Sequence, residues 1–288
     1  MEASIQIVHA ATAREFWALL SPEKPAFAEP CELLYRGQAD DRWNLTPGIF
    51  RRGTSSAADG QVFKEWAYID TFVRHCDSIG LAIPNDSPAF RETFLNRNVP
   101  TGWPAIGAHV SEWPPKEIHP LMALAQHYRL PTRLLDWSTR AYVAAYFGIS
   151  DALAKKIDRV ERLAVWILDI EKRAHFPELK VVTVPGGNNA NLAAQSGRFT
   201  LLTQVGGRAR PIEGEIALDL YFAARQHVPP LKKITLPIDE APAALELCSL
   251  YGVTGATLFP DYYGATRATE DSLSTAPKNG TLSLWELQ

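Results

Sequence analysis

The stretch that decides the fold runs from Leu121 to Phe147 and reads LMALAQHYRLPTRLLDWSTRAYVAAYF. Its first part is predicted to be a helix that ends at Tyr128. Pro131 then disfavours helical geometry at Leu130, which predicts a tight break. Residues 133–137 are typical of a short strand, and a second helix follows. Helix, break, strand and helix therefore succeed one another within 27 residues.

Polar side chains gather at the joints of this stretch instead of along its outer faces. Junctions between strands and helices often hold ligand-binding groups, because the free N–H groups of a helix start attract anions. We therefore expect a binding site here, built from Gln126, His127, Tyr128, Arg133, Asp136, Ser138, Thr139 and Tyr142.

The same residues also have structural interpretations. Asp136 would cap the helix that starts near Thr139, and the aromatic residues would lie in the core. A single histidine such as His127 is more often a hydrogen-bonded structural residue than a catalytic one. These interpretations account for the caps and the aromatic residues. They do not account for the crowding of so many polar side chains in one short span.

The overall composition limits the possible functions. The chain has 288 residues, of which 46% are hydrophobic, and its net charge is −3, so no global field attracts nucleic acid or an anionic membrane. A local basic groove is compatible with this charge. No apolar run approaches the roughly 18 residues of a membrane span, and the N-terminus does not resemble a secretory signal. We expect a cytoplasmic protein without a membrane partner.

Several familiar chemistries leave no trace in the sequence. It contains no glycine-rich dinucleotide fingerprint, no phosphate loop, no zinc-protease motif and no nucleophile elbow. The three cysteines and seven histidines lack metal-ligand spacing. We therefore expect neither a metal nor a bound cofactor.

The predicted elements mix helices and strands without regular alternation. Residues 163–170 form a continuous apolar run that predicts a buried strand, and a capping pattern at Thr12 predicts a helix near the N-terminus. A short strand is expected just before Leu258. This order favours an α+β fold with a mixed, partly antiparallel central sheet. We expect one domain, residues 1–288, with a helical insertion at about 53–120.

Three shorter motifs lie outside the central stretch. Tyr35-Arg36-Gly37-Gln38 ends a predicted strand, where the planar fork of Arg36 can face a phosphate or a carboxylate. In the structural alternative, Arg36 pairs with Asp136. Gln195-Ser-Gly-Arg-Phe199 leads into a predicted strand. Asp261 follows a proline and, in its structural alternative, caps a last helix.

Together these blocks resemble the FRG-domain family, which is named for a Phe/Tyr-Arg-Gly motif. They follow family order from about Leu33 to Asp261 and cover most of the chain. Arg129 departs from the glycine that the family usually carries before Leu-Pro-Thr. The family has little assigned chemistry, and the resemblance implies bacterial or phage origin and a link to defence or toxin systems. The matching blocks are Tyr35-Arg-Gly-Gln38, Leu124-Ala-Gln-His-Tyr128, Leu130-Pro-Thr-Arg-Leu-Leu-Asp-Trp137, Ala194-Gln-Ser-Gly-Arg-Phe-Thr200 and Leu258-Phe-Pro-Asp261.

The order of the blocks is also similar to that of ADP-ribosyltransferases, which have a split central sheet. This likeness implies NAD as the substrate. Arg36 would hold a phosphate or ribose of NAD, and Ser138 or Thr139 would orient the nicotinamide ribose. Tyr128, Tyr142 or a tryptophan would stack on the nicotinamide ring.

The same likeness raises the question of the catalytic acid. Departure of nicotinamide leaves an oxocarbenium-like centre that needs a nearby carboxylate. The neutral Gln195 occupies the place of the acid, so Asp136 or Asp261 supplies the charge, or the domain binds a nucleotide without turning it over. The predicted catalytic residues are Arg36, Asp136, Ser138 and Gln195. The predicted binding residues are Tyr35, Gly37, Gln38, Gln126, His127, Tyr128, Arg133, Thr139, Tyr142, Phe199 and Asp261.

Three functions follow from the sequence. The first is an NAD-using, ADP-ribosyltransferase-like effector in a defence or toxin system. The second is a non-catalytic module that binds a nucleotide or a partner in phage defence. The third is a metal-dependent nuclease that would use Asp136 and Asp261, although the sequence lacks a recognisable acid cluster.

Overall fold

The computed structural model describes residues 5–23, 32–95, 110–155, 160–184, 195–225 and 227–275. Its centre is a seven-stranded sheet with the order β1-β7-β4-β2-β3-β6-β5. Among the described strands, β1 and β7 pair in parallel and all other neighbours are antiparallel. The predicted α+β class with a mixed, partly antiparallel sheet is therefore confirmed. The strands are β1 (Gln6–His9), β2 (Leu33–Gln38), β3 (Leu135–Ser138), β4 (Arg162–Asp169), β5 (Leu179–Val182), β6 (Gly197–Leu202) and β7 (Leu231–Pro237).

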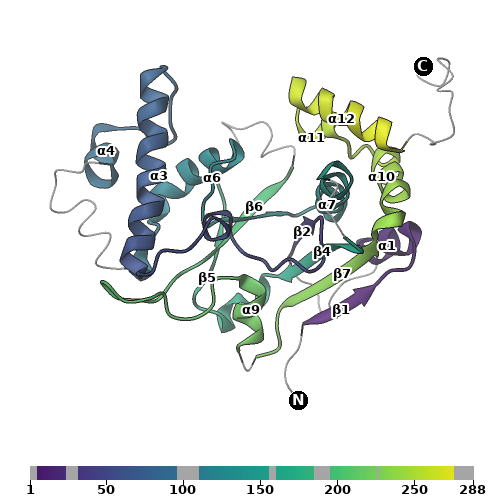
Figure 1. Ribbon diagram of the computed structural model, residues 1–288, viewed down its shortest axis with the longest axis horizontal. Coiled ribbons are helices and arrows are strands. Elements are labelled where there is room, and N and C mark those ends of the chain that lie inside the picture. Colours follow the sequence, from purple (N-terminus) through teal and green to yellow (C-terminus); the bar gives the residue numbers. More distant parts are fainter. Residues whose placement is uncertain are drawn as a thin grey trace.

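Most of the described helices form two groups, one beside each half of the sheet (Figure 1). One group contains α3 (Ala58–Ser78), α4 (Pro88–Phe94) and α6 (His119–His127), and the other contains α1 (Ala13–Leu19), α7 (Ala141–Lys155), α10 (Ala241–Leu250), α11 (Gly255–Leu258) and α12 (Tyr262–Thr275). None of the described helices is both long enough and apolar enough to cross a membrane. The remaining short helices are α2 (Gly48–Arg51), α9 (Leu218–Ala223), η1 (Val110–Glu112), η2 (Lys116–Ile118), η3 (Glu171–His175) and η5 (Ile238–Glu240).

The apolar run of β4 is explained by burial on both faces of the sheet. Val165 and Ile167 belong to a core cluster with α1, α7 and α10. Trp166 and Leu168 belong to a second cluster with α9 on the opposite face. Successive strand residues point to opposite sides, so a strand that is covered twice needs apolar residues throughout. A third cluster joins α3 and α6 to β5 and β6.

Gly37 allows β2 to pack directly against α7. A Cβ atom at Gly37 would lie 2.0 Å from the carbonyl oxygen of Ala144 and 2.6 Å from the backbone nitrogen of Gly148. Both contacts are with helix backbone, which cannot move aside as a flexible side chain does. The glycine of the Arg-Gly motif therefore fixes the distance between strand and helix, and with it the position of Arg36.

The sheet is nearly split between β2 and β3. β2 pairs with β4 along its whole length, from Leu33 opposite Asp169 to Gln38 opposite Ala164. With β3 it shares a single residue pair, Tyr35 opposite Ser138. The strands β1, β7, β4 and β2 thus form one half of the sheet, and β3, β6 and β5 form the other.

Arg129 ends α6 in a left-handed conformation, with φ of 68°. The N–H of Leu130 bonds to the carbonyl of Ala125, and the N–H of Arg129 bonds to that of Gln126. This pattern is a Schellman motif, whose left-handed position is usually glycine. Arg129 therefore stands where a glycine would be free of backbone strain, at the position where the FRG-domain family usually has one.

Two expectations about local structure are wrong. The strand predicted just before Leu258 is the helix α11, which Thr254 caps by accepting a hydrogen bond from the N–H of Thr257. Asp136 does not cap a helix, because it lies within β3 and α7 begins only at Ala141. The first strand, β1, was not anticipated, because an edge strand of four mostly exposed residues leaves little apolar pattern. That residues at about 53–120 form a helical insertion in one domain stays a prediction.

Candidate functional site

A pocket of about 300 Å³ opens where β2 and β3 diverge. This volume is at the lower end of the range for small-molecule sites, roughly 300–1,000 Å³. It accommodates one nucleoside-sized group. The lining contains the four predicted catalytic residues and five of the predicted binding residues, which are Tyr35, Gly37, Gln126, His127 and Phe199.

Arg36 links the two halves of the sheet across this pocket. It extends from β2, and its Nη1 donates a hydrogen bond of 2.7 Å to the backbone carbonyl of Asp136 in β3. The same nitrogen lies 3.6 Å from the Asp136 carboxylate. The Nε of Arg36 is buried and has no hydrogen-bond partner among the described residues. The pairing of Arg36 with Asp136 that the structural interpretation expected is therefore present, and it leaves one guanidinium N–H unsatisfied.

The Asp136 carboxylate is held from the other side by Gln126. The Gln126 amide donates a hydrogen bond of 2.5 Å to Oδ1 of Asp136, and its Oε1 accepts a hydrogen bond from the Thr132 hydroxyl. The Thr132 hydroxyl in turn accepts from the N–H of Leu134. This chain joins the end of α6, the Leu-Pro-Thr turn and β3. It fixes the direction of an exposed carboxylate in advance of any ligand.

Ser138 and Gln195 tie the opposite rim together. The Ser138 hydroxyl donates to the carbonyl of Gln195 at 2.8 Å and accepts from the N–H of Arg140 at 3.0 Å. The side-chain amide of Gln195 donates to the carbonyl of Leu258 at 3.3 Å. Both side chains line the pocket, but their strongest contacts are with backbone groups.

Aromatic side chains form the apolar part of the lining. Phe147 comes from α7, Phe199 from β6 and Phe259 from the loop after α11. The rings of Phe147 and Phe259 meet edge to face with centroids 6.0 Å apart. Flat apolar walls of this kind suit a planar ring, because aromatic pairs prefer edge-to-face or offset stacking.

His127 lines the pocket at the end of α6. Burial lowers the pKa of His127, while the nearby carboxylates of Asp261 and Asp136 oppose this shift. The imidazole is therefore neutral near pH 7, and it can accept as well as donate a hydrogen bond.

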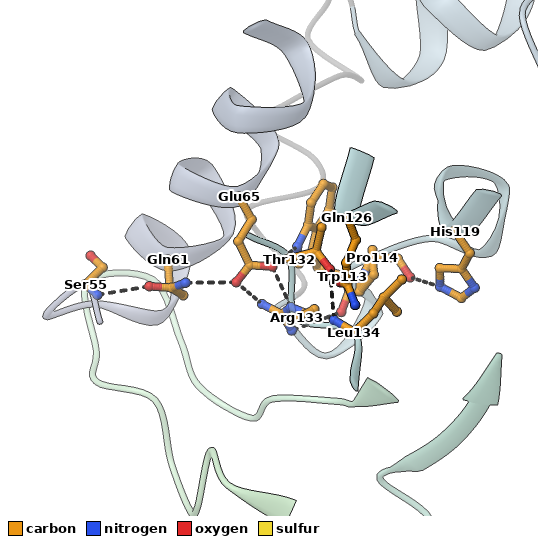
Figure 2. A network of polar contacts seen from close by, with 10 residues as sticks. All are labelled: Ser55, Gln61, Glu65, Trp113, Pro114, His119, Gln126, Thr132, Arg133 and Leu134. Carbon is orange, nitrogen blue, oxygen red and sulfur yellow. Dashed lines mark hydrogen bonds and ion pairs between the residues drawn. The ribbon is translucent and has the colours of Figure 1, made fainter. Parts of the chain in front are cut away.

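Arg133 lies outside the pocket, in a buried network that connects to α3 (Figure 2). Its Nε and Nη2 donate to the two carboxylate oxygens of Glu65 at 2.6 and 2.9 Å. Glu65 also accepts from Trp113 Nε1 at 3.0 Å and from the Gln61 amide at 2.9 Å. Every charged atom of this pair thus has partners within the protein, which is the pattern of a structural ion pair.

The other predicted binding residues also lie outside the pocket lining. Gln38 is buried and accepts a hydrogen bond from Trp166 Nε1. Tyr128 is largely exposed, and Thr139 is exposed in the short connection between β3 and α7. Tyr142 stacks flat on Trp17 with centroids 3.8 Å apart. Asp261 accepts a hydrogen bond from the N–H of Gly264, which confirms its interpretation as a helix cap.

Sequence reasoning missed the contribution of α7 to the pocket. Ala144, Phe147 and Asp151 line it from this helix, and their spacing of three and four residues places them on one helical face. Asp151 pairs with Arg267 of α12 at 2.8 Å. The helical spacing was visible in the sequence, but nothing in the sequence indicated that this face borders a pocket.

A second missed residue is Arg51, at the end of α2. The residue as a whole is exposed, but partial burial of its guanidinium lowers the pKa of Arg51. The charge of Arg36 lowers this pKa further, and that of Asp136 opposes the shift. Arg51 is therefore close enough to the Arg36–Asp136 pair to interact with it. Arg51 is not part of the pocket lining, but two guanidinium groups that interact with one carboxylate suit a ligand with more than one negative charge.

Within the described parts of the chain, no group of three or more His, Cys, Asp or Glu residues is placed to hold a metal ion. The nuclease hypothesis requires such a group, because hydrolysis of phosphodiesters by metal ions depends on carboxylate or histidine ligands. It therefore gains no support from the described residues.

Comparison with known proteins gives one match. Residues 31–157 match the FRG domain. Neither the curated proteins nor the solved structures contain a match to this chain. The matched range includes β2, the central stretch and α7, and so it contains Arg36, Gln126, Asp136 and Asp151.

Proposed function

We propose that the pocket between β2 and β3 is the active centre of the FRG domain that residues 31–157 match, and that its substrate is NAD. The reaction would break the bond between nicotinamide and ribose, as in an ADP-ribosyltransferase or an NAD glycohydrolase. The observation that carries this proposal is the Arg36–Asp136 pair, which joins neighbouring strands where the sheet separates.

The pocket offers a partner for each part of the NAD molecule that reacts. Arg36 has a buried N–H without a partner among the described residues, and Arg51 is close enough to interact with it. Both guanidinium groups would bind the pyrophosphate. Phe147, Phe199 and Phe259 would enclose the nicotinamide ring. The volume of about 300 Å³ fits the nicotinamide ribose half, so the adenosine half would lie outside the pocket.

Asp136 would supply the carboxylate that Gln195 lacks. When the C–N bond breaks, its electron pair leaves with nicotinamide and positive charge develops on the ribose. A fixed carboxylate nearby stabilises that charge without having to reorganise. Asp136 is exposed to the pocket and held in place by Gln126, whereas Asp261 is engaged in capping α12. Water or an acceptor group would then attack the ribose and complete the exchange.

The setting of this activity follows from the family resemblance. We propose an effector in a bacterial or phage defence or toxin system, where consumption of NAD or modification of a target would stop growth. The cytoplasmic location stays a prediction.

A second candidate function is a nucleotide sensor without chemistry. It is favoured by the neutral Gln195 and by the engagement of the Asp136 carboxylate with Gln126 and Arg36. Both features would allow the pocket to bind a nucleotide and leave it intact.

One titration separates the two candidates. Purified protein is titrated with NAD in a calorimeter, and nicotinamide is quantified in the same samples. We expect binding with release of nicotinamide, and loss of both in Arg36→Ala. The matched control is Arg42→Ala, because Arg42 is exposed, pairs with Asp40 and is absent from the pocket lining. Binding without release would favour the sensor. Absence of binding would contradict both.

A further inference from the structure

A second cavity of about 680 Å³ lies beside β5, the strand at one edge of the sheet. It is larger than the pocket between β2 and β3, and its lining is strongly basic. Four cationic side chains face it: Lys116 of η2, Arg173 of η3, Lys180 of β5 and Arg198 of β6. The only carboxylate in its described lining is Glu32. We call this cavity the basic groove.

No carboxylate of a described residue forms an ion pair with any of the four cations of the basic groove. Within the described residues, Arg173 and Arg198 donate only to backbone carbonyls, those of Ile170 and Gly197. Lys116 and Lys180 have no ion pair with a described residue. The neighbouring Lys172, in contrast, lies 3.4 Å from the Asp169 carboxylate.

This concentration of positive charge does not follow from the composition. The chain has 32 acidic and 29 basic residues, so its average surface is slightly negative. Like charges that face one cavity repel each other and disfavour the folded state. A cluster of cations that have no ion-pair partner among the described residues, in a net acidic protein, is therefore best explained by an anionic ligand that the cluster binds.

His119 supports the same interpretation. It lines the groove and donates a hydrogen bond from Nε2 to the carbonyl of Pro114, at the edge of the network that contains Glu65 and Arg133 (Figure 2). Burial lowers the pKa of His119, and the positive charge of Lys180 lowers it further. The imidazole therefore lies within the field of the cationic cluster.

We propose that the basic groove binds the phosphate backbone of a single-stranded nucleic acid. The cations come from four separate elements, η2, η3, β5 and β6, around a cavity that residues 179–183 line, which suits a chain of phosphates better than one isolated phosphate. Guanidinium forks match phosphate oxygens, and positively charged grooves that follow the backbone are typical of proteins that bind single strands. Arg198 lines the basic groove and also the pocket between β2 and β3, so the bound strand reaches the mouth of that pocket. The inference does not depend on NAD chemistry.

The test is fluorescence anisotropy with labelled single-stranded DNA and RNA oligonucleotides at several salt concentrations. For contacts between four cations and four phosphates, the logarithm of the association constant should fall with the logarithm of salt with a slope of about −2.8, since each phosphate contributes roughly 0.7. Lys180→Glu and Arg173→Glu should each weaken binding at least about tenfold at low salt and make the slope less steep by about 0.7. The matched control is Lys172→Glu, which changes the same charge in η3 outside the groove. It should bind almost as well as the unaltered protein.

Three results would overturn the proposal. The first is the absence of oligonucleotide binding by the unaltered protein at low salt. The second is a loss in Lys172→Glu equal to that in Lys180→Glu. The third is displacement of the oligonucleotide by an equally charged poly-glutamate peptide at equal concentration, which would identify the groove as a site for acidic protein segments. Lys180 and Arg173 do not line the pocket between β2 and β3. Nicotinamide release measured on the same variants therefore distinguishes failure of the groove proposal from failure of the proposed reaction.

Discussion

Two ion pairs of this molecule use residues of the same central stretch and differ in almost every physical respect. In the Arg133–Glu65 pair the two side chains are 1% and 2% exposed. In the Arg36–Asp136 pair they are 16% and 58% exposed, and one guanidinium N–H has no partner among the described residues. The buried pair is complete in itself and holds α3 to the sheet. The open pair has capacity for a ligand.

An arginine next to a predicted site is not by itself a site residue. Arg133 and Asp136 are three positions apart, and both were predicted to bind the ligand. What separates them is the partner that tertiary structure supplies. Glu65 of α3 satisfies Arg133 from a distant part of the chain. Among the described residues, the Asp136 carboxylate bonds to Gln126 and lies near Arg36.

Removal of one partner from the buried pair should give the largest effect. Glu65→Ala leaves Arg133 charged and buried and also deprives Trp113 and Gln61 of an acceptor. We expect a loss of about 3–5 kcal/mol in the free energy of unfolding, measured by chemical denaturation. Asp136→Ala, at the exposed pair, should cost less than about 1 kcal/mol. Equal losses in the two variants would remove the distinction between the pairs.

The next largest effect should come from the residue that positions the open pair. Gly37→Ala places a methyl group against the backbone of Ala144 and Gly148, and α7 would have to move. We expect a loss of about 3 kcal/mol in the free energy of unfolding. Gly48→Ala is the control, because its new methyl group would meet Pro131 at an ordinary 3.6 Å. Full stability of Gly37→Ala would show that the contact between strand and helix is adaptable.

A smaller effect is expected at Arg129, in the turn after α6. Here a substitution should raise the free energy of unfolding. Arg129 has a left-handed conformation that glycine adopts without strain, which is worth roughly 1 kcal/mol or more. Within the described part of the chain, its side chain contacts Tyr263 through an exposed hydrogen bond of 3.2 Å and a cation–π contact. Arg129→Gly should therefore raise the free energy of unfolding by about 0.5–1 kcal/mol. Arg129→Ala loses the same contact without relief of strain and should be destabilising. A gain in both variants would contradict this account.

The smallest effect should be that of His127, which lines the pocket, on the pH dependence of stability. Burial lowers the pKa of His127 in the folded protein, whereas the unfolded imidazole titrates near about 6.5. As the pH falls below this value, the unfolded chain binds the proton first, so stability falls until the lower folded pKa is reached. His127→Gln should therefore lose less stability than the unaltered protein between about pH 7.5 and about pH 5.5, by under about 1 kcal/mol. The pKa of His119 is lowered as well. Because His119 is present in both proteins, its contribution drops out when their losses of stability are subtracted. An equal or larger loss in the variant would be the opposite result.

Much of the fold could be predicted because local patterns decide it. The run at 163–170 predicted β4, and the polar joints of the central stretch predicted where Gln126, Asp136 and Ser138 would lie. The family resemblance supplied Arg36 and Gln195, which are distant in sequence from that stretch. These residues line one pocket because β2, β3 and β6 lie on either side of the separation in the sheet.

What could not be predicted depended on distant partners. Nothing local reveals that Arg133 meets Glu65, that Tyr142 stacks on Trp17, or that Asp151 faces the pocket. The strand expected before Leu258 was wrong because four residues are too few for a period to decide between helix and strand. There the cap at Thr254 determined the outcome.

The most direct test of the central claim is the rate at which nicotinamide leaves NAD in the Asp136→Asn variant. This substitution keeps the shape of the side chain and removes its charge. Asp239→Asn serves as the matched control, because Asp239 is exposed on η5 and absent from the pocket lining. If Asp136 stabilises the developing positive charge, Asp136→Asn should release nicotinamide at least about 100-fold more slowly, while its stability and its affinity for NAD change little. An Asp136→Asn protein that releases nicotinamide as fast as the unaltered protein would contradict the account.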